Sequence, residues 1–118
     1  MSMLNATYPA LAAFRALGQK LGVTANNVAN VNTNGFKKSR AVLQEADPSG
    51  VTVSINKINT PGVPLPAENG TAETQESSNV ALEEEMTGLM TVQRAYTANL
   101  KAIKAEDEIL GKLFDVFA

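Results

Sequence analysis

Cysteine, histidine and tryptophan are all absent from the 118-residue sequence. Without cysteine, the chain has no disulfides, no zinc–thiolate centre and no cysteine nucleophile. Without histidine, it lacks the commonest metal ligand and the commonest general base near neutral pH. These absences argue against most hydrolase and metalloenzyme functions. We therefore predict a protein that is not an enzyme, with no catalytic residues, no cofactor and no metal site.

Aromatic residues are also scarce, at 5% of the sequence, although hydrophobic residues make up 44%. The core must therefore consist mainly of aliphatic side chains and alanine, and both alanine and leucine favour helices. A chain of this length provides for one domain. No apolar run is long enough to span a membrane, and the first residues lack the basic start of a secretory signal peptide, so we expect neither feature.

Acidic residues are missing from the first third of the chain. Residues 1–40 carry a charge of +5, residues 41–78 carry −4 and residues 79–118 carry −3, which gives the net charge of −2. Opposite charges would attract each other within one chain or between neighbouring copies; a chance distribution is the alternative interpretation. The small net charge does not indicate a nucleic-acid-binding protein.

Residues 1–35 are predicted to form a helix and a turn. Apolar or small residues recur from about Met3 to Ala29 in alternating steps of three and four, as in a coiled coil. We call these positions the first seam: Leu4, Thr7, Leu11, Phe14, Gly18, Leu21, Ala25 and Val28. Pro9 interrupts the pattern and predicts a kink, or a separate turn before it. The Asn-rich residues 30–35 should end the helix, since Asn34-Gly35 favours a turn.

Residues 36–78 are predicted to form a small β-hairpin and a Pro-rich extended connection. Residues 39–45 alternate weakly between apolar and polar side chains and residues 51–58 alternate cleanly, with a turn signal between them. An isolated hairpin is marginally stable, so this one must pack on another element. The prolines of residues 59–67 exclude a helix and a β-ladder, and the polar residues 68–78 are typical of a flexible segment.

Residues 79–118 show the strongest helical pattern. Ser78 or Asn79 is predicted to cap this helix, because three glutamates follow near the first turn, where negative charge is favourable. A second seam comprises Leu82, Met86, Leu89, Gln93, Tyr96, Leu100, Ile103, Asp107, Leu110, Phe114 and Phe117. A helix of about 57 Å results, and the first helix, at about 40 Å, is too short to cover it. The uncovered apolar stripe predicts partners.

Polar residues within and beside the second seam have two possible roles. Buried Gln93 and Asp107 would set the register and the choice of partner in a coiled coil; partial solvation is the alternative interpretation. The acidic clusters at 83–85 and 106–108 do not indicate a metal site, because consecutive side chains fan around a helix.

Two motifs resemble those of a known family. Residues 25–40, which read ANNVANVNTNGFKKSR, resemble the N-terminal motif of the bacterial flagellar rod and hook axial proteins. Ser78-Asn-Val, Glu85-Met86, residues 93–99 and residues 107–110 resemble the C-terminal motif of the same family. The two motifs occur in the family's order and together extend over nearly half of the chain.

The resemblance implies a structural subunit of the flagellar basal-body rod, located in the periplasmic space. We expect a mainly α fold in which the N- and C-terminal helices pair as an antiparallel coiled-coil hairpin. The implied partners are copies of the chain, other rod and hook proteins and the type III export apparatus, without nucleic acid or membrane insertion. Export would occur without a cleaved signal peptide, and many copies would stack around the export channel.

The short connection between the motifs, about 40 residues, is most similar to that of the short proximal-rod members. Hook and distal-rod subunits of this family carry larger β-rich domains there. Asn34 departs from the usual motif, in which many members have proline, so the exact rod position stays open. A small helical-hairpin adaptor or export chaperone that binds an amphipathic helix is the alternative function.

The motifs and seams together select the residues that we expect to mediate assembly. Their asparagines allow two interpretations: they cap a helix and a turn, or they clamp that helix end against the second helix or a neighbouring subunit. The selected residues are Leu11, Phe14, Leu21, Asn26, Asn27, Val28, Asn30, Thr33, Gly35, Phe36, Asn79, Met86, Leu89, Gln93, Arg94, Tyr96, Asn99, Leu100, Ile103, Leu110 and Phe114.

Overall fold

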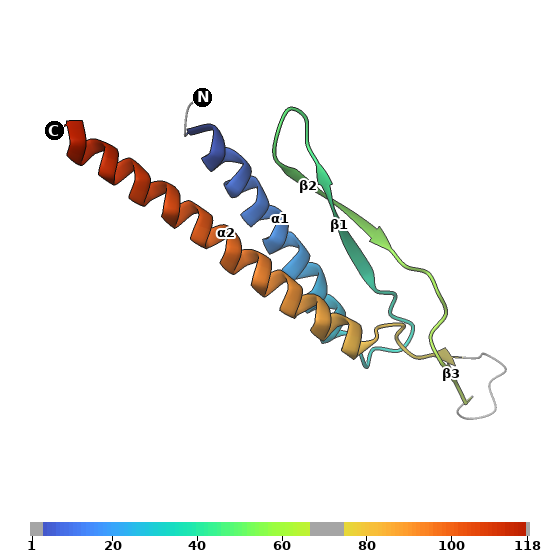
Figure 1. The fold of residues 1–118 in the computed structure, drawn as a ribbon. Helices are drawn as coiled ribbons and strands as arrows, with labels where there is room; N and C mark the ends of the chain where they lie inside the picture. Colours follow the sequence, from blue (N-terminus) through green and yellow to red (C-terminus); the bar gives the residue numbers. More distant parts are fainter. Residues whose placement is uncertain (1–3, 67–74, 118) are drawn as a thin grey trace.

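The computed structural model describes residues 4–66 and 75–117 of an elongated molecule that measures 81 × 25 × 14 Å. It is mainly helical, with a small antiparallel sheet inserted between two helices. Figure 1 shows α1 in the middle, α2 along one side of it and the β1–β2 hairpin along the other. The elements are α1 (Leu4–Ala29), β1 (Ser39–Glu45), β2 (Val51–Lys57), β3 (Pro64–Leu65), β4 (Gln75–Glu76) and α2 (Leu82–Phe117).

The predicted first helix is confirmed, but the separate turn before Pro9 is wrong. Helix α1 begins at Leu4 and contains Pro9 in its second turn. Proline there removes the hydrogen bond to the carbonyl of Asn5, and the flanking turns continue the helix. The helix ends as expected, because the Asn30 amide is shared between the carbonyls of Asn26 (3.2 Å) and Asn27 (3.1 Å).

The predicted hairpin is confirmed, and it packs on α1. Strands β1 and β2 pair antiparallel from Ser39 opposite Lys57 to Glu45 opposite Val51. Gly50 closes the turn with a φ of 107°, a conformation that side chains disfavour. A Cβ at Gly50 would lie 3.4 Å from that of Ala12 on α1, so the turn lies directly against the helix.

The expected absence of a ladder in the Pro-rich connection is wrong at one point. Pro64–Leu65 pairs antiparallel with Gln75–Glu76. Proline is tolerated there because both strands of a two-stranded sheet are edge strands, and a missing N–H on an outer edge costs little. Of the predicted flexible segment, residues 68–74 lie outside the described residues, and the remainder includes strand β4.

Helix α2 begins three residues later than predicted, at Leu82, and neither Ser78 nor Asn79 caps it. The carbonyl of Ala81 instead accepts the first helical hydrogen bonds. Ser78 Oγ accepts a hydrogen bond from the Val80 amide at 3.1 Å, and the Asn79 side chain bonds to the hairpin. Both side chains stabilise the turn before the helix. The three glutamates do lie in the first turn, as expected.

The buried core lies between the three layers, and none of its apolar members is a seam position. Its apolar members are Ala16, Leu17, Ala41 and Val92. Leu11 and Leu21 of the first seam are nearly half exposed, so apolar surface stays open on α1 as well as on α2. The seams assumed a single partner for each helix, whereas α1 is covered by α2 on one side and by the hairpin on another. Within the described residues, neither helix is apolar enough over a sufficient length to cross a bilayer.

Candidate functional site

Asn27 joins three elements at one end of the molecule. Its side chain is 2% exposed. Its Nδ2 donates to the Ser39 carbonyl at 2.8 Å and to Glu85 Oε1 at 3.2 Å, and its Oδ1 accepts from the Ser39 amide at 3.0 Å. The Asn27 side chain pairs with both the amide and the carbonyl of Ser39, as a neighbouring strand would at the edge of β1. The same side chain also binds Glu85 on α2.

Asn79 closes the open end of the hairpin. Its Oδ1 accepts from the Lys38 amide at 2.7 Å, and its Nδ2 donates to the carbonyls of Ile58 (2.8 Å) and Thr60 (3.0 Å). Its own amide donates to the Phe36 carbonyl at 3.2 Å. Asn27, on α1, and Asn79, in the turn before α2, thus bind the consecutive residues Ser39 and Lys38. We name this pair of side chains and the backbone they bind the asparagine junction.

The turn after α1 is held by the remaining residues of the N-terminal motif. Asn30 Nδ2 donates to the Asn26 carbonyl at 2.8 Å, and Thr33 Oγ1 donates to Asn30 Oδ1 at 3.1 Å. Gly35, with a φ of 76°, donates its amide to the Glu76 carbonyl at 2.8 Å. Capping and clamping therefore coexist in this motif: the Asn30 side chain caps the last turn of α1 at the Asn26 carbonyl, and Asn27 clamps α1 to α2.

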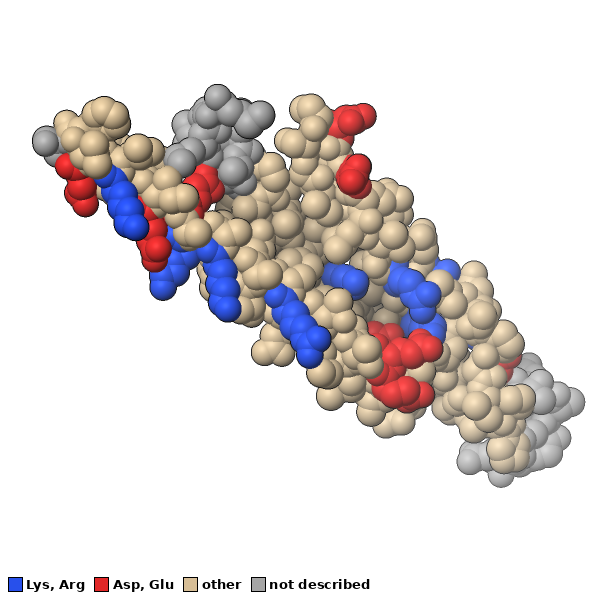
Figure 2. All heavy atoms as spheres, in the orientation of Figure 1, with Lys and Arg blue, Asp and Glu red and all other residues tan. Residues whose placement is uncertain are grey.

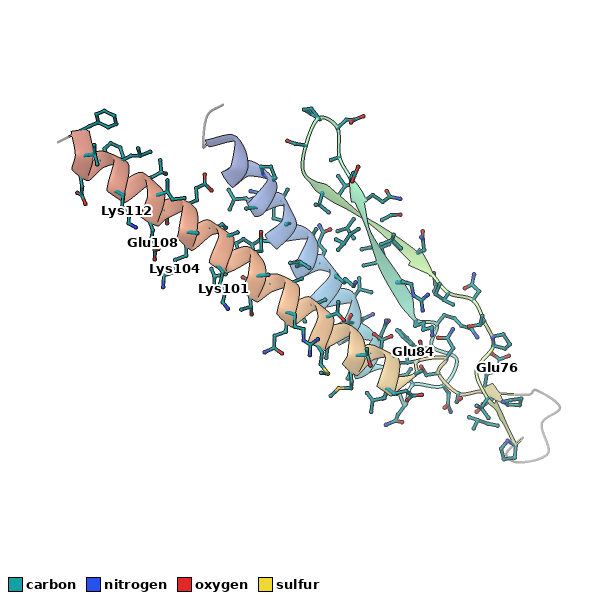
Figure 3. All side chains as sticks on the ribbon, viewed as in Figure 1. Glu76, Glu84, Lys101, Lys104, Glu108 and Lys112 are labelled. Atoms are coloured by element: carbon teal, nitrogen blue, oxygen red, sulfur yellow. The ribbon has the colours of Figure 1, made fainter. Side chains whose placement is uncertain are left out.

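Basic residues of the N-terminal third meet acidic residues beside this junction. Lys37 Nζ lies 2.9 Å from Glu76 Oε2, and Lys38 Nζ lies 3.2 Å from Glu84 Oε2 (Figure 3 labels both glutamates). The hydrogen bond from Lys37, and then its positive charge, lower the pKa of Glu76 from its ordinary value of 4.5. Part of the charge asymmetry of the sequence is therefore neutralised within one chain.

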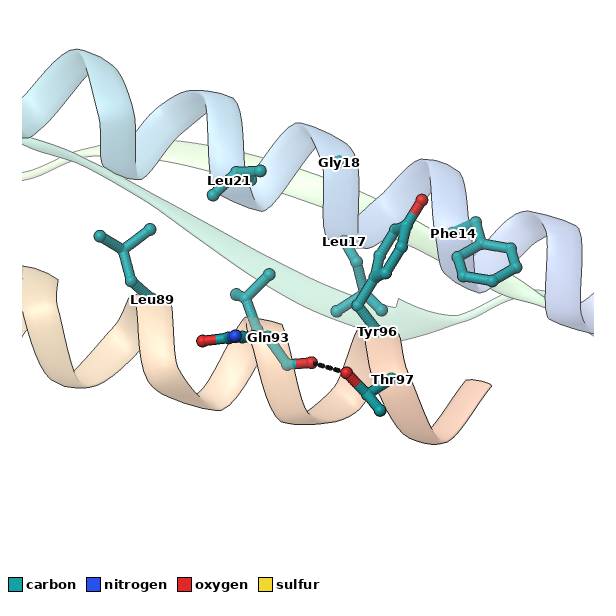
Figure 4. A pocket seen from close by; sticks show the side chains of 9 residues that line it. Phe14, Leu17, Gly18, Leu21, Leu89, Gln93, Tyr96 and Thr97 are labelled. Atoms are coloured by element: carbon teal, nitrogen blue, oxygen red, sulfur yellow. Dashed lines mark hydrogen bonds between the residues drawn. The ribbon is translucent and has the colours of Figure 1, made fainter. Parts of the chain in front are cut away.

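An open apolar groove of about 540 Å³ runs between α1 and α2 (Figure 4). The ring centroids of Phe14 and Tyr96 lie 4.7 Å apart across it, and Asn99 Nδ2 donates to the Ala10 carbonyl at 2.8 Å nearby. Because residue numbers rise along α1 as they fall along α2, these contacts show that the two helices run antiparallel. The groove is lined by Phe14, Leu17, Gly18, Leu21, Leu89, Val92, Gln93, Tyr96 and Thr97.

The other selected residues do not gather at one place. Most lie along the surfaces of the helices, with their side chains exposed or half-buried. Leu11, Met86, Arg94, Leu100 and Phe114 are exposed; Val28, Ile103 and Leu110 are half-buried. Phe114 is 73% exposed near the end of α2. The structure thus leaves a long apolar surface open along the helices.

The sequence-based selection missed the residues between the layers. The buried residues that it missed are Ala16, Leu17, Thr24, Ala41 and Val92. Ala16 lies beside Val51 and Val53 of β2, and Leu17 and Val92 line the groove between the helices. The requirement that the hairpin pack on another element was the available signal, since it implies a second buried face on one helix. Within the described ranges, no group of three or more acidic residues could hold a metal ion.

An elongated, mainly helical chain with a small core and exposed apolar helix surfaces has the features of a subunit of a larger structure. Residues 8–37 match the family described as flagella basal body rod protein. Residues 72–116 match the family described as flagellar basal body rod FlgEFG protein C-terminal. The asparagine junction draws one asparagine from each of the two matched segments.

Two curated relatives agree with these matches. The chain is 34% identical over 83 residues to the flagellar basal-body rod protein FlgG of Bacillus subtilis; the aligned segment covers 65% of this chain and 31% of that protein. It is 37% identical over 65 residues to the flagellar hook protein FlgE of Caulobacter vibrioides; the aligned segment covers 52% of this chain and 11% of that protein. The chain spans about a third or less of these relatives. It belongs to the flagellar rod and hook family of structural axial proteins, as predicted.

Proposed function

We propose that this chain is a structural subunit of the flagellar basal-body rod. It assembles with copies of itself and with other rod and hook proteins into a tube around the export channel, in the periplasmic space. The type III export apparatus delivers it there without removal of a signal peptide. The observation that carries this proposal is the apolar surface that both helices leave open, from Leu11 and Leu21 on α1 to Leu100 and Phe114 on α2.

Energetics favour folding that depends on assembly. Each fully buried Leu or Phe contributes about 1.5–3 kcal/mol, whereas ordering the backbone costs about 1–2 kcal/mol per residue. Among the described residues, the apolar side chains that are buried are Ala16, Leu17, Ala41 and Val92, and two of these are alanines. A single chain should therefore be close to zero stability, and burial of the open helix surfaces in the assembly stabilises it.

The helix pair is the assembly unit in this proposal. The antiparallel contacts of Phe14 with Tyr96 and of Ala10 with Asn99 support a coiled-coil hairpin whose exposed seam positions pack on adjacent subunits. We assign residues 1–35 and 79–118 to the N- and C-terminal axial segments of one domain, and residues 36–78 to its connection. The short connection, whose β1–β2 hairpin packs on α1, supports a place in the proximal rod.

A second candidate function rests on the groove between the helices. An amphipathic helix of another protein would fit such an apolar groove, as expected for an adaptor or an export chaperone. Sedimentation and circular dichroism over a range of concentrations distinguish the two functions. A rod subunit gains helix as it polymerises, whereas an adaptor remains a discrete monomer or dimer of constant helicity.

Replacement of Leu100 by Asp tests the rod function in cells. Leu100 is 53% exposed, so a single chain tolerates the change, but a carboxylate there would be buried without a partner in the assembly. Ala105→Asp is the matched control, because it adds the same charge to the exposed, Lys-rich side of α2. We expect loss of rod assembly and motility for Leu100→Asp, and also for Ile103→Asp. Normal rods in both variants would contradict the proposal.

A further inference from the structure

The end of α2 extends past the start of α1 (Figure 1). Since Ala10 lies opposite Asn99 and Phe14 opposite Tyr96, Leu4 lies opposite about residue 106. Residues 107–117, which we name the overhang, therefore continue for about 16 Å beyond the start of α1. They remain fully helical.

The overhang is apolar along most of its surface. Phe114, Val116 and Phe117 are 73%, 76% and 83% exposed, the highest values among the large hydrophobic side chains that the structure describes. Ile109 and Leu113 are nearly half exposed. Phe114 and Phe117 lie on the side of α2 that faces α1 further along the helix, because they follow Ile103 and Leu110 in steps of three to four residues. The overhang thus presents the surface with which α2 already binds a helix.

The overhang and the paired parts of the helices carry opposite charges. Residues 107–117 contain three acids and one base, for a net charge of −2. The helix segments that form the groove, residues 9–29 and 86–105, contain no acid and five basic residues: Arg15, Lys20, Arg94, Lys101 and Lys104. Of these, Arg94 and Lys101 line a hollow that shares Gln93 and Thr97 with the groove. Figure 2 shows the basic side chains along α2, and Figure 3 labels Lys101 and Lys104 on its outer side. The negative charge of the overhang and the positive charge of these helix segments would attract the overhang of another copy to the groove.

We propose that the overhang of one copy docks in the groove between α1 and α2 of a second copy. Phe114 and Phe117 pack against the rim formed by Leu21 and Tyr96. The acids of the overhang face Arg94 and Lys101, which line a hollow adjoining the groove. The overhang and the groove are different surfaces of the chain. When two copies bind, one copy therefore keeps a free groove and the other keeps a free overhang. A contact between two different surfaces extends into an open helical chain of subunits when its rotation does not close a ring, as a rod requires. This inference specifies the contact within the proposed rod function and rests on it.

Cysteine cross-linking tests the contact directly, because the natural chain contains no cysteine. One batch of full-length chain carries Phe114→Cys and another carries Leu21→Cys; both side chains are exposed, so neither substitution removes a buried contact of the single chain. The batches are mixed and oxidised mildly. A control mixture replaces Leu21→Cys with Asn56→Cys, on the exposed part of β2 away from the groove.

Docking holds the two thiols together and should yield about tenfold more mixed dimer for Phe114 with Leu21 than for the control mixture. The yield should fall as salt is added, since part of the attraction is between charges. Equal yields in both mixtures, with a natural chain that still polymerises, would overturn this contact and leave the rod function standing. Equal yields with a natural chain that never polymerises would overturn both. A homodimer of Phe114→Cys alone in excess of the mixed dimer would show that overhangs bind each other, and would also overturn the inference.

Discussion

The side-chain amide of Asn27 on α1 pairs with both the amide and the carbonyl of Ser39, the first residue of β1. This pairing, together with the bond to Glu85, fixes the hairpin and α2 to the same helix end. A single buried side chain therefore determines how the connection leaves α1. Assembly of the rod in this account depends on that geometry, because it places the two helices side by side.

Asn27→Ala should destabilise the folded chain strongly. The substitution leaves the two backbone groups of the half-buried Ser39 without their side-chain partner, at a cost of about 2 kcal/mol. Where folding and assembly are coupled, this loss raises the critical concentration for polymerisation about 30-fold. Asn26→Ala is the matched control, since the Asn26 side chain is exposed and should change the value little. Equal effects of the two substitutions in a sedimentation assay would contradict the role of Asn27.

Gly62→Ala and Gly88→Ala should act in opposite directions. A Cβ at Gly62 would overlap the backbone carbonyl of Ser77, so that the connection must move before alanine fits. At Gly88, within α2, no atom lies within 4 Å of an added Cβ, and alanine favours a helix by about 1 kcal/mol. Polymerisation should therefore require more protein for Gly62→Ala and less for Gly88→Ala. The same direction of change for both would show that the approach of residue 62 to Ser77 is unimportant.

Acid should weaken the folded chain partly through Glu76. Lys37 lowers the pKa of this carboxyl in the folded state, first by its hydrogen bond and then by its charge. The resulting stabilisation is present above the ordinary carboxyl pKa of 4.5 and is lost as the pH falls through the lower folded value. Helix content should consequently fall less steeply with acid in Glu76→Gln than in the natural chain, as measured by circular dichroism of the assembled protein. An unchanged acid profile would rule out this contribution.

Phe14 and Tyr96 should be energetically coupled. Their tilted rings lie 4.7 Å apart, and such a pair contributes about 0.5–1.5 kcal/mol beyond the burial of its area. A double-mutant cycle with Phe14→Leu and Tyr96→Leu measures the coupling as a change in critical concentration. The double variant should be less impaired than the sum of the single variants. Strict additivity would mean that the rings do not stabilise each other.

The sequence predicts the elements of this fold better than their mutual packing. Hydrophobic periodicity located both helices, and alternation between Ser39 and Lys57 located the hairpin. The predicted cap at Ser78 or Asn79 was wrong for two reasons. The Ser78 side chain binds the Val80 amide within the turn before the helix, and the Asn79 side chain binds Lys38, which is distant in sequence. Similarly, Pro64 was excluded from a ladder by a rule that applies to central strands and not to edges.

The candidate site was predictable where it is encoded locally. The turn from Asn30 to Gly35 follows from the conformational preferences of asparagine and glycine. The bond between Asn27 and Ser39 does not, since a buried asparagine at a helix end becomes a clamp only when the hairpin lies beside it. The seams were partly misplaced for the same reason: periodicity identifies an apolar side of a helix but not how many elements cover it.

Cryo-electron imaging of isolated basal bodies that carry a tagged version of this chain tests the central claim most directly. The account predicts tag density along the rod, and helical subunit density into which two antiparallel helices and a small hairpin fit. Intact rods without the tag, or tag density confined to the export apparatus or to soluble complexes, would contradict a structural role in the rod.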